Sequence, residues 1–155
     1  MYTRNVGRKV IDLVNILIAD DDLNFSKDLI NNILSNKEVK ICKLCTNGKE
    51  VLQVLDNEEI DIIILDLRMP IFNGLEVLDN LSDLQKEKYK NSIIVISGDD
   101  GYFSQLIKSS LVFDYVFKGT KTHDIAFRIN RLIEHKDIFS KRKKIIDELK
   151  KLVII

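Results

Sequence analysis

The stretch Asp61-Ile62-Ile63-Ile64-Leu65-Asp66-Leu67-Arg68-Met69-Pro70 decides the fold of this chain. Its run of Ile and Leu is typical of a strand that is buried on both faces, as strands of parallel sheets are. Asp66 stands at the carboxyl end of this strand, and Pro70 prevents the strand from continuing. Ligands of open α/β sheets bind outside the carboxyl ends of the strands. We therefore expect Asp66 to belong to a functional site.

The composition of the 155 residues is that of an ordinary soluble domain, with 45% hydrophobic and 31% charged residues. One domain is the expected number at this length. No apolar stretch approaches the ~20 residues of a membrane span. The N-terminal basic residues are not followed by the unbroken apolar segment of a signal peptide. We therefore predict a cytoplasmic protein that does not associate with a membrane.

The formal net charge is zero, so the chain as a whole gives no indication of nucleic-acid binding. The charge is unevenly spread, however. Residues 131–155 hold eight Lys and Arg against four Asp and Glu, a formal charge of +4 that leaves −4 on the remainder. The sequence therefore predicts an acidic body with a basic C-terminal segment.

Apolar runs predict five strands, and an amphipathic segment follows each of them. The strands are expected at 15–19, 39–45, 61–65, 93–97 and 112–117. Strands that alternate with helices indicate a parallel sheet covered on both faces. The fold class is therefore α/β, a five-stranded doubly wound sheet of order 2-1-3-4-5 with the flavodoxin-like architecture. We also expect an extended C-terminal helix.

Start signals place the helices between these strands. Asp22 is the expected N-cap of the first helix, and Thr46-Asn47-Gly48 makes the turn into the second. Asn73-Gly74 opens a third helix, which we expect to continue as far as Leu84. A shorter helix is expected around 103–107, and the last helix begins near Thr122.

Four of the five strands end in residues that could do chemistry. These residues are Asp20, Asp21, Asp66, Ser97 and Lys118. Each of them alone is more often a solvated loop end or a helix cap, but a parallel sheet brings all five to one edge. Three adjacent carboxylates repel unless a cation lies among them, and Mg²⁺ suits such a site. An Asp carboxylate can accept a phosphoryl group, whose oxygens a hydroxyl and an ammonium can bind.

Four motifs together resemble the response-regulator receiver domain of two-component signalling, the CheY-like family. They are Ile-Leu-Ile-Ala-Asp-Asp at 16–21, Ile-Leu-Asp-Leu-Arg-Met-Pro at 64–70 followed by Asn73-Gly74, Ile-Val-Ile-Ser-Gly at 94–98, and Asp-Tyr-Val-Phe-Lys at 114–118. The similarity covers about residues 15–135, with the motifs in the order and spacing of the family.

The resemblance implies a role for each matching position. Asp66 corresponds to the phosphorylated aspartate, which also contacts the metal. Asp20 and Asp21 correspond to the acid pair that holds Mg²⁺, and the backbone carbonyl of Arg68 to the third protein ligand of that ion.

Three further positions match the switch and the phosphate contact of the family. Ser97 corresponds to the switch hydroxyl, which is often Thr, and Tyr115 to the switch aromatic. Lys118 corresponds to the phosphate-binding lysine. The family usually has a cis-proline after this lysine, whereas this chain has Gly119. A cis bond before a non-proline residue costs about 2.5–4 kcal/mol, so we expect a trans peptide.

The resemblance also implies partners. A sensor histidine kinase would supply the phosphoryl group, and the domain would catalyse only its own phosphorylation and dephosphorylation, so it is not a conventional enzyme. Phosphorylation would remodel the face formed by the helix around 103–107, the strand at 112–117 and the last helix. That face would serve a homodimer or another output, most simply the control of transcription.

Three parts of the chain are expected: an N-terminal extension at 1–13, the receiver domain at 14–136, and an amphipathic helical tail or linker at 137–155. The apolar residues of the tail recur at roughly helical spacing: Ile138, Phe139, Ile145, Ile146, Leu149, Leu152 and Val153. The tail is either a solvated extension of the last helix or a linker or dimerising helix. The linker would lead to an output domain that this sequence does not contain, and only that domain would bind DNA.

The sequence has features of two other functions. Phosphatases of the haloacid-dehalogenase type also use an Asp after a buried strand, but they place a second acid two residues later, where this chain has Arg68. A receiver-like module that binds a partner without phosphorylation is the more serious alternative. With Gly119 in place of the usual proline, the sequence does not fix the direction in which the Lys118 side chain points.

Cys42-Lys43-Leu44-Cys45 is a nominal C-x-x-C motif, but it falls in a predicted strand, where positions i and i+3 point to opposite faces. A redox motif would open a helix. A zinc site would need about two further ligands, and the histidines, His123 and His135, lie far away in the sequence. We expect two reduced cysteines.

Overall fold

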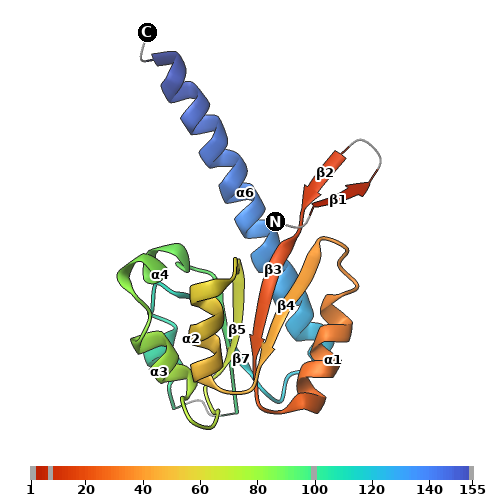
Figure 1. Cartoon of the computed structure of the whole chain (residues 1–155), viewed down its shortest axis with the longest axis vertical. Helices are drawn as coiled ribbons and strands as arrows, with labels where there is room; N and C mark the ends of the chain where they lie inside the picture. The colour runs from red at the N-terminus through yellow and green to blue at the C-terminus, as the bar shows by residue number, and fades with distance from the viewer. Residues whose placement is uncertain (1–2, 7–8, 99–100, 154–155) are drawn as a thin grey trace.

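Five parallel strands form the central sheet, in the order β4-β3-β5-β6-β7 (Figure 1). Their bounds are β3 Val14–Ala19, β4 Val39–Cys45, β5 Ile62–Asp66, β6 Ile93–Ser97 and β7 Val112–Phe117. In chain order this is 2-1-3-4-5, so the predicted doubly wound α/β fold is confirmed. The computed structural model describes residues 3–6, 9–98 and 101–153.

Helices cover both faces of this sheet. Their bounds are α1 Leu23–Ile33, α2 Gly48–Asn57, α3 Gly74–Asp79, α4 Asp83–Lys88, α5 Phe103–Leu106 and α6 Thr122–Val153. The helices α1 and α6 pack on one face, and α2 and α3 on the other (Figure 1). The central strand explains this arrangement, because all five residues of β5 are buried. Ile62 and Ile64 join the apolar cluster beneath α1 and α6, whereas Ile63 and Leu65 join the opposite one.

The third predicted helix is in fact two helices, so the expectation that it continues to Leu84 is wrong. The α3 helix ends at Asp79, and α4 begins after Ser82. The side chain of Ser82 accepts the N–H of Gln85, and Gln85 caps the N–H of Ser82 in return. This capping box starts a new helix with a new direction. Leu84 consequently lies on the outer side of α4 and is 85% exposed.

The two cysteines do not point to opposite faces of the sheet, as the strand spacing predicted. A bulge interrupts the pairing of β3 with β4: Ile16 pairs with Ile41, and Leu17 then pairs with Lys43, so Cys42 is passed over. The extra residue reverses the alternation, and Cys42 and Cys45 both pack against the same apolar cluster. Both thiols are free.

An N-terminal hairpin and the C-terminal part of α6 extend away from the central sheet (Figure 1). Strands β1 Thr3–Val6 and β2 Lys9–Asp12 form an antiparallel hairpin within the stretch predicted as an extension. At the other end, α6 continues without interruption to Val153, so the predicted tail is a continuation of the last helix. Ile154, Ile155, Asp99 and Asp100 lie outside the described residues.

None of the helices in the described part of the chain is both long enough and apolar enough to cross a membrane.

Gly74 allows α3 to start directly against the central strand. Its N–H donates to the carbonyl of Leu67 at 3.0 Å. A Cβ at this position would meet the backbone carbonyl of Asp66 and lie 2.9 Å from the Cα of Leu67. Backbone atoms cannot give way as a flexible side chain can, so this position accepts only glycine without rearrangement.

We therefore predict that Gly74→Ala lowers the free energy of unfolding by about 2–3 kcal/mol, measured by urea denaturation. Gly98→Ala is the matched control, because a Cβ there would meet no atom within 4 Å. We expect the control to change stability by less than about 0.5 kcal/mol. Equal stability of the two variants would show that α3 does not start against the strand in this way.

Candidate functional site

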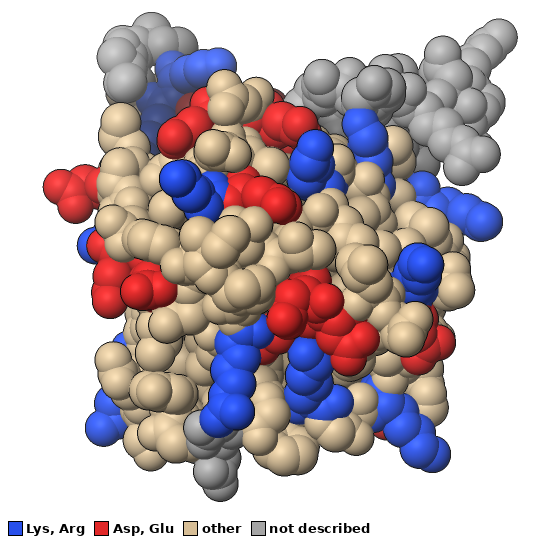
Figure 2. Space-filling model, turned by 60° about the horizontal axis from the view of Figure 1, so that its bottom comes forward, with Lys and Arg blue, Asp and Glu red and all other residues tan. Residues whose placement is uncertain are grey.

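The predicted site residues lie together at the carboxyl edge of the sheet. Asp20 and Asp21 directly follow β3, Asp66 and Ser97 are the last residues of β5 and β6, and Lys118 directly follows β7. Figure 2 turns this edge forward, and acidic side chains gather below the centre of the view with Lys and Arg side chains beside them. The parallel sheet therefore brings together residues from across the chain, as the sequence predicted.

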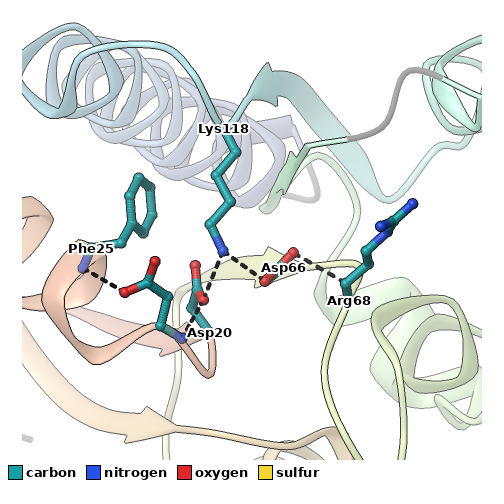
Figure 3. Close-up of polar contacts among 6 residues, drawn as sticks. Asp20, Phe25, Asp66, Arg68 and Lys118 are labelled. Atoms are coloured by element: carbon teal, nitrogen blue, oxygen red, sulfur yellow. Dashed lines mark hydrogen bonds and ion pairs between the residues drawn. The ribbon is translucent and has the colours of Figure 1, made fainter.

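Lys118 joins two of the carboxylates (Figure 3). Its ammonium nitrogen lies 3.0 Å from Oδ1 of Asp20 and 3.1 Å from Oδ2 of Asp66. Both carboxylates are only 2% exposed, whereas Asp21 is exposed. Because the two carboxylates are largely shielded from water, their Coulomb attraction to Lys118 is stronger than that in a surface salt bridge.

Backbone N–H groups orient the same two carboxylates. Oδ1 of Asp66 accepts the N–H of Arg68 at 3.1 Å, and Oδ1 of Asp20 accepts the N–H of Asp22 at 2.8 Å. Asp22 itself caps α1, as predicted, by accepting the N–H of Phe25 at 3.1 Å. Each acid is thus held by the loop that follows its own strand.

The backbone of Lys118 is also fixed. Its N–H donates to the carbonyl of Ser97 at 2.8 Å, and the N–H of Thr120 donates to the carbonyl of Phe117 at 2.9 Å. The peptide between Lys118 and Gly119 is trans, as expected for a non-proline residue. The lysine therefore reaches both carboxylates without the cis bond that the family usually has.

The pKa values of Asp20 and Lys118 are both shifted from their ordinary values. Burial raises the pKa of Asp20 to about 6, against the opposing effects of the Asp22 N–H and the Lys118 ammonium. Burial alone would lower the pKa of Lys118, but its hydrogen bonds to Asp20 and Asp66 outweigh that effect and raise the pKa. Lys118 therefore stays charged, whereas burial, with a smaller contribution from the nearby charge of Asp66, disfavours the ionised form of Asp20.

The acidic residues fit a divalent cation. Carboxylate oxygens of Asp20, Asp21 and Asp66 lie within 4.8 Å of one another. Oδ2 of Asp20 is buried and has no hydrogen-bond partner, so it is free to act as a ligand. With Lys118 the group carries a formal charge of −2, and oxygen ligands of this kind are those that Mg²⁺ prefers. The site therefore suits the Mg²⁺ ion that the resemblance to receiver domains implies.

The two predicted switch residues are both buried. Ser97 is fully buried beside the site, and Tyr115 is 7% exposed. The ring of Tyr115 makes an edge-to-face contact with Phe103 of α5, with centroids 5.4 Å apart. In this structure Tyr115 thus already lies inward.

One contact of the site was missing from the sequence-based prediction. The ammonium of Lys118 lies 5.2 Å from the centroid of the Phe25 ring. Helical periodicity shows which side of the first helix is buried but not which residue of the rest of the chain lies opposite, so it could not predict this contact.

Comparison with known proteins identifies the family. The response regulator receiver domain family matches residues 16–130, which is more than half of the chain. The chain is also similar to individual bacterial regulators, with moderate identity.

It is 28% identical over 125 residues to the probable C4-dicarboxylate response regulator DctR of Bacillus subtilis, covering 78% of this chain and 52% of that protein. It is 29% identical over 126 residues to the regulatory protein VanR of Enterococcus faecium, covering 81% of this chain and 52% of that protein. The chain thus spans about half the length of these curated relatives.

The fold agrees with that of solved receiver domains. The REC domain of AraT, a response regulator from Geobacillus stearothermophilus, is similar with a TM-score of 0.69 and 24% identity, covering 83% of this chain and 98% of that one. A CheY-like receiver domain protein from Methanospirillum hungatei gives a TM-score of 0.65 at 21% identity, covering 81% and 98%. The strand order, the motifs at the strand ends and the family match lead to one conclusion: this chain belongs to the response regulator receiver domains of two-component systems.

Proposed function

We propose that this domain accepts a phosphoryl group on Asp66 from a sensor histidine kinase and passes the signal to an output through its α5-β7-α6 face. The observation that carries the proposal is the contact of Lys118 with both Asp20 and Asp66, which assembles the acceptor, an acid of the metal site and the counter-charge at one point.

The transfer is a displacement at phosphorus. An oxygen of Asp66 attacks the phosphoryl group of a phosphohistidine, the P–N bond breaks, and an acyl phosphate P–O bond forms. The released imidazole nitrogen keeps the electron pair of the broken bond. Such a reaction needs mainly positioning and charge stabilisation, which the residues around Asp66 can supply.

Each surrounding residue has a part in this reaction. Asp20, Asp21, Asp66 and the carbonyl of Arg68 would hold Mg²⁺, which neutralises charge on the phosphoryl oxygens when bound. The ammonium of Lys118 would pair with one of these oxygens. The buried hydroxyl of Ser97 would donate to another, and Tyr115 and its partner Phe103 would then repack together.

Exposed apolar side chains at the same edge of the sheet support docking of a protein donor. They are Leu23 after β3, Ile71 after β5 and Phe117 at the end of β7, with exposed fractions of 47%, 75% and 54%. Ile71 also has a φ of 68°, which is unusual for a β-branched residue. A large exposed apolar side chain held in that conformation suits a partner surface.

The α5-β7-α6 face is the proposed output surface, and a homodimer is the simplest partner. This face includes an ion pair in which Arg128 of α6 contacts both oxygens of Asp114 of β7 at 3.1 Å. The same helix carries the exposed ring of Phe127. Aromatic residues and arginines are enriched in protein interfaces. The rest of α6 would then lead to an output domain, most simply one that controls transcription by binding DNA.

Asp66→Asn should abolish labelling by a small phosphodonor in the presence of Mg²⁺, because the amide cannot act as the acceptor. Intact mass spectrometry would detect the added phosphoryl group on the wild type and none on the variant. Asp79→Asn, at an exposed position on α3, is the control and should be labelled as the wild type. Undiminished labelling of Asp66→Asn would contradict the assignment.

Asp20→Asn should abolish the stabilisation of the protein by Mg²⁺. Millimolar Mg²⁺ is expected to raise the Tm of the wild type but not that of the variant, since binding to the folded state alone adds stability. Because the pKa of Asp20 is raised to about 6, the affinity of the wild type for Mg²⁺ should fall as the pH drops through this value.

Without Mg²⁺, Asp20→Asn should stabilise the folded protein at neutral pH. A raised pKa means that the folded state binds the Asp20 proton more tightly than the unfolded state does, so stability is lost as the pH rises from 3.8 to about 6. Asp20→Asn removes this loss and should raise the free energy of unfolding at neutral pH by an amount on the order of 1 kcal/mol. Asp147→Asn on α6 is the control and should leave the free energy of unfolding unchanged.

For the Mg²⁺ measurement, a rise in the Tm of Asp20→Asn on addition of Mg²⁺ would count against the metal site.

Phe127→Glu should weaken dimer formation by the activated protein. We expect beryllofluoride with Mg²⁺ to shift the wild type toward a dimer in sedimentation velocity, and the variant to need about tenfold higher protein concentration. Leu84→Glu, which places the same charge on exposed α4, should dimerise normally. Equal dimerisation of all three proteins would exclude the α5-β7-α6 face.

A further inference from the structure

The ring of Phe25 lies beside the ammonium of Lys118 (Figure 3). The distance of 5.2 Å from Nζ to the ring centroid is within the ~6 Å over which an aromatic face attracts a cation. Phe25 stands in the first turn of α1, whereas Lys118 follows β7, so the contact links residues that lie far apart in the sequence. Lys118 makes this cation–π contact in addition to its ion pairs with Asp20 and Asp66.

The contact closes a cycle of interactions. Lys118 donates to Oδ1 of Asp20, the same oxygen accepts the N–H of Asp22, and the Asp22 side chain accepts the N–H of Phe25. The ring of Phe25 then returns to Lys118. The start of α1 therefore fixes, at the same time, the carboxylate and the aromatic face between which the ammonium lies.

The side chain of Lys118 is long and flexible, so a restraint on its position matters. A lysine has about 2 kcal/mol of rotamer entropy, and the bond from its N–H to Ser97 fixes only its backbone. The next residue is Gly119, which restrains the backbone least of all residues. Ion pairs to Asp20 and Asp66 hold the ammonium now, but a phosphoryl group on Asp66 would require it to change partners.

We propose that Phe25 is a positioning residue that keeps the ammonium of Lys118 over Asp66 while its anionic partners change. The proposal rests on the proposed phosphoacceptor function. An aromatic ring suits this task because its attraction depends little on direction across the face and leaves all three N–H groups free for oxygens. The alternative is that Phe25 only fills the apolar cluster between α1 and the sheet, against which it also packs.

A chemical-shift measurement separates these two roles without any phosphorylation. In protein with ¹³C-labelled lysine, the ε-methylene of Lys118 should be shifted upfield by the ring. Lys88 should show a similar shift, because its ammonium lies 5.4 Å from the centroid of the Tyr89 ring, so the Lys118 peak is assigned by its loss in Lys118→Arg. Phe25→Leu, which keeps apolar volume, should remove the shift, and Phe25→Tyr should keep it. Phe113→Leu is the matched control, because Phe113 packs against the same cluster but its ring lies near His135.

The second measurement is the affinity for beryllofluoride with Mg²⁺. Phe25→Leu should weaken binding by about two- to fivefold, whereas Phe25→Tyr and Phe113→Leu should stay within about twofold of the wild type. An unshifted Lys118 methylene in the wild type, which requires no variant to fold, would overturn the proposal. Unchanged beryllofluoride affinity in folded Phe25→Leu would also overturn it.

The two proposals fail in different ways. A wild type that binds no beryllofluoride would overturn the phosphoacceptor function, and the methylene shift would still decide whether Phe25 holds Lys118. A wild type that binds beryllofluoride but shows no ring shift would leave the function standing and overturn the role of Phe25.

Discussion

The ion pairs of one lysine with two buried carboxylates are the interaction on which the arrangement of this site depends. Lys118 can reach Asp20 and Asp66 only because β3, β5 and β7 run parallel and end at the same edge. One cation cannot neutralise three acids. Burial raises the pKa of Asp20, and the charge of Asp66 adds a smaller contribution in the same direction. The site therefore carries an excess of negative charge that a further cation such as Mg²⁺ would balance.

The site also shows how local structure prepares its geometry. Asp22 and Asn73 cap the helices that follow two of these strands, and backbone N–H groups in the same loops orient Asp20 and Asp66. Gly74 lets α3 begin against the backbone of Asp66. A site built from loops that are pinned at strand ends and helix starts keeps its shape more reliably than one built on free loops.

The contacts beyond the ion pairs connect this edge to surfaces where a partner could bind. Phe25 joins Lys118 to α1, and Tyr115 joins β7 to α5 through Phe103. Phe25 faces the Lys118 ammonium, and Tyr115 makes an edge-to-face contact with the ring of Phe103. Under the proposed function, a change at Asp66 would reach α1 and α5 through these packing contacts.

The sequence alone predicted the five strands of the central sheet and the residues at their ends, because apolar runs, caps and a proline are local signals, and the alternation of strands with helices predicted their order. It did not predict the hairpin of β1 and β2. It did not predict the break between α3 and α4, since the Leu pattern continued across a capping box centred on Ser82. The shared face of Cys42 and Cys45 came from a bulge, which depends on pairing with β3. Likewise, only the tertiary structure placed Phe25 beside Lys118, because periodicity shows which side of a helix is buried but not what the rest of the chain brings against it.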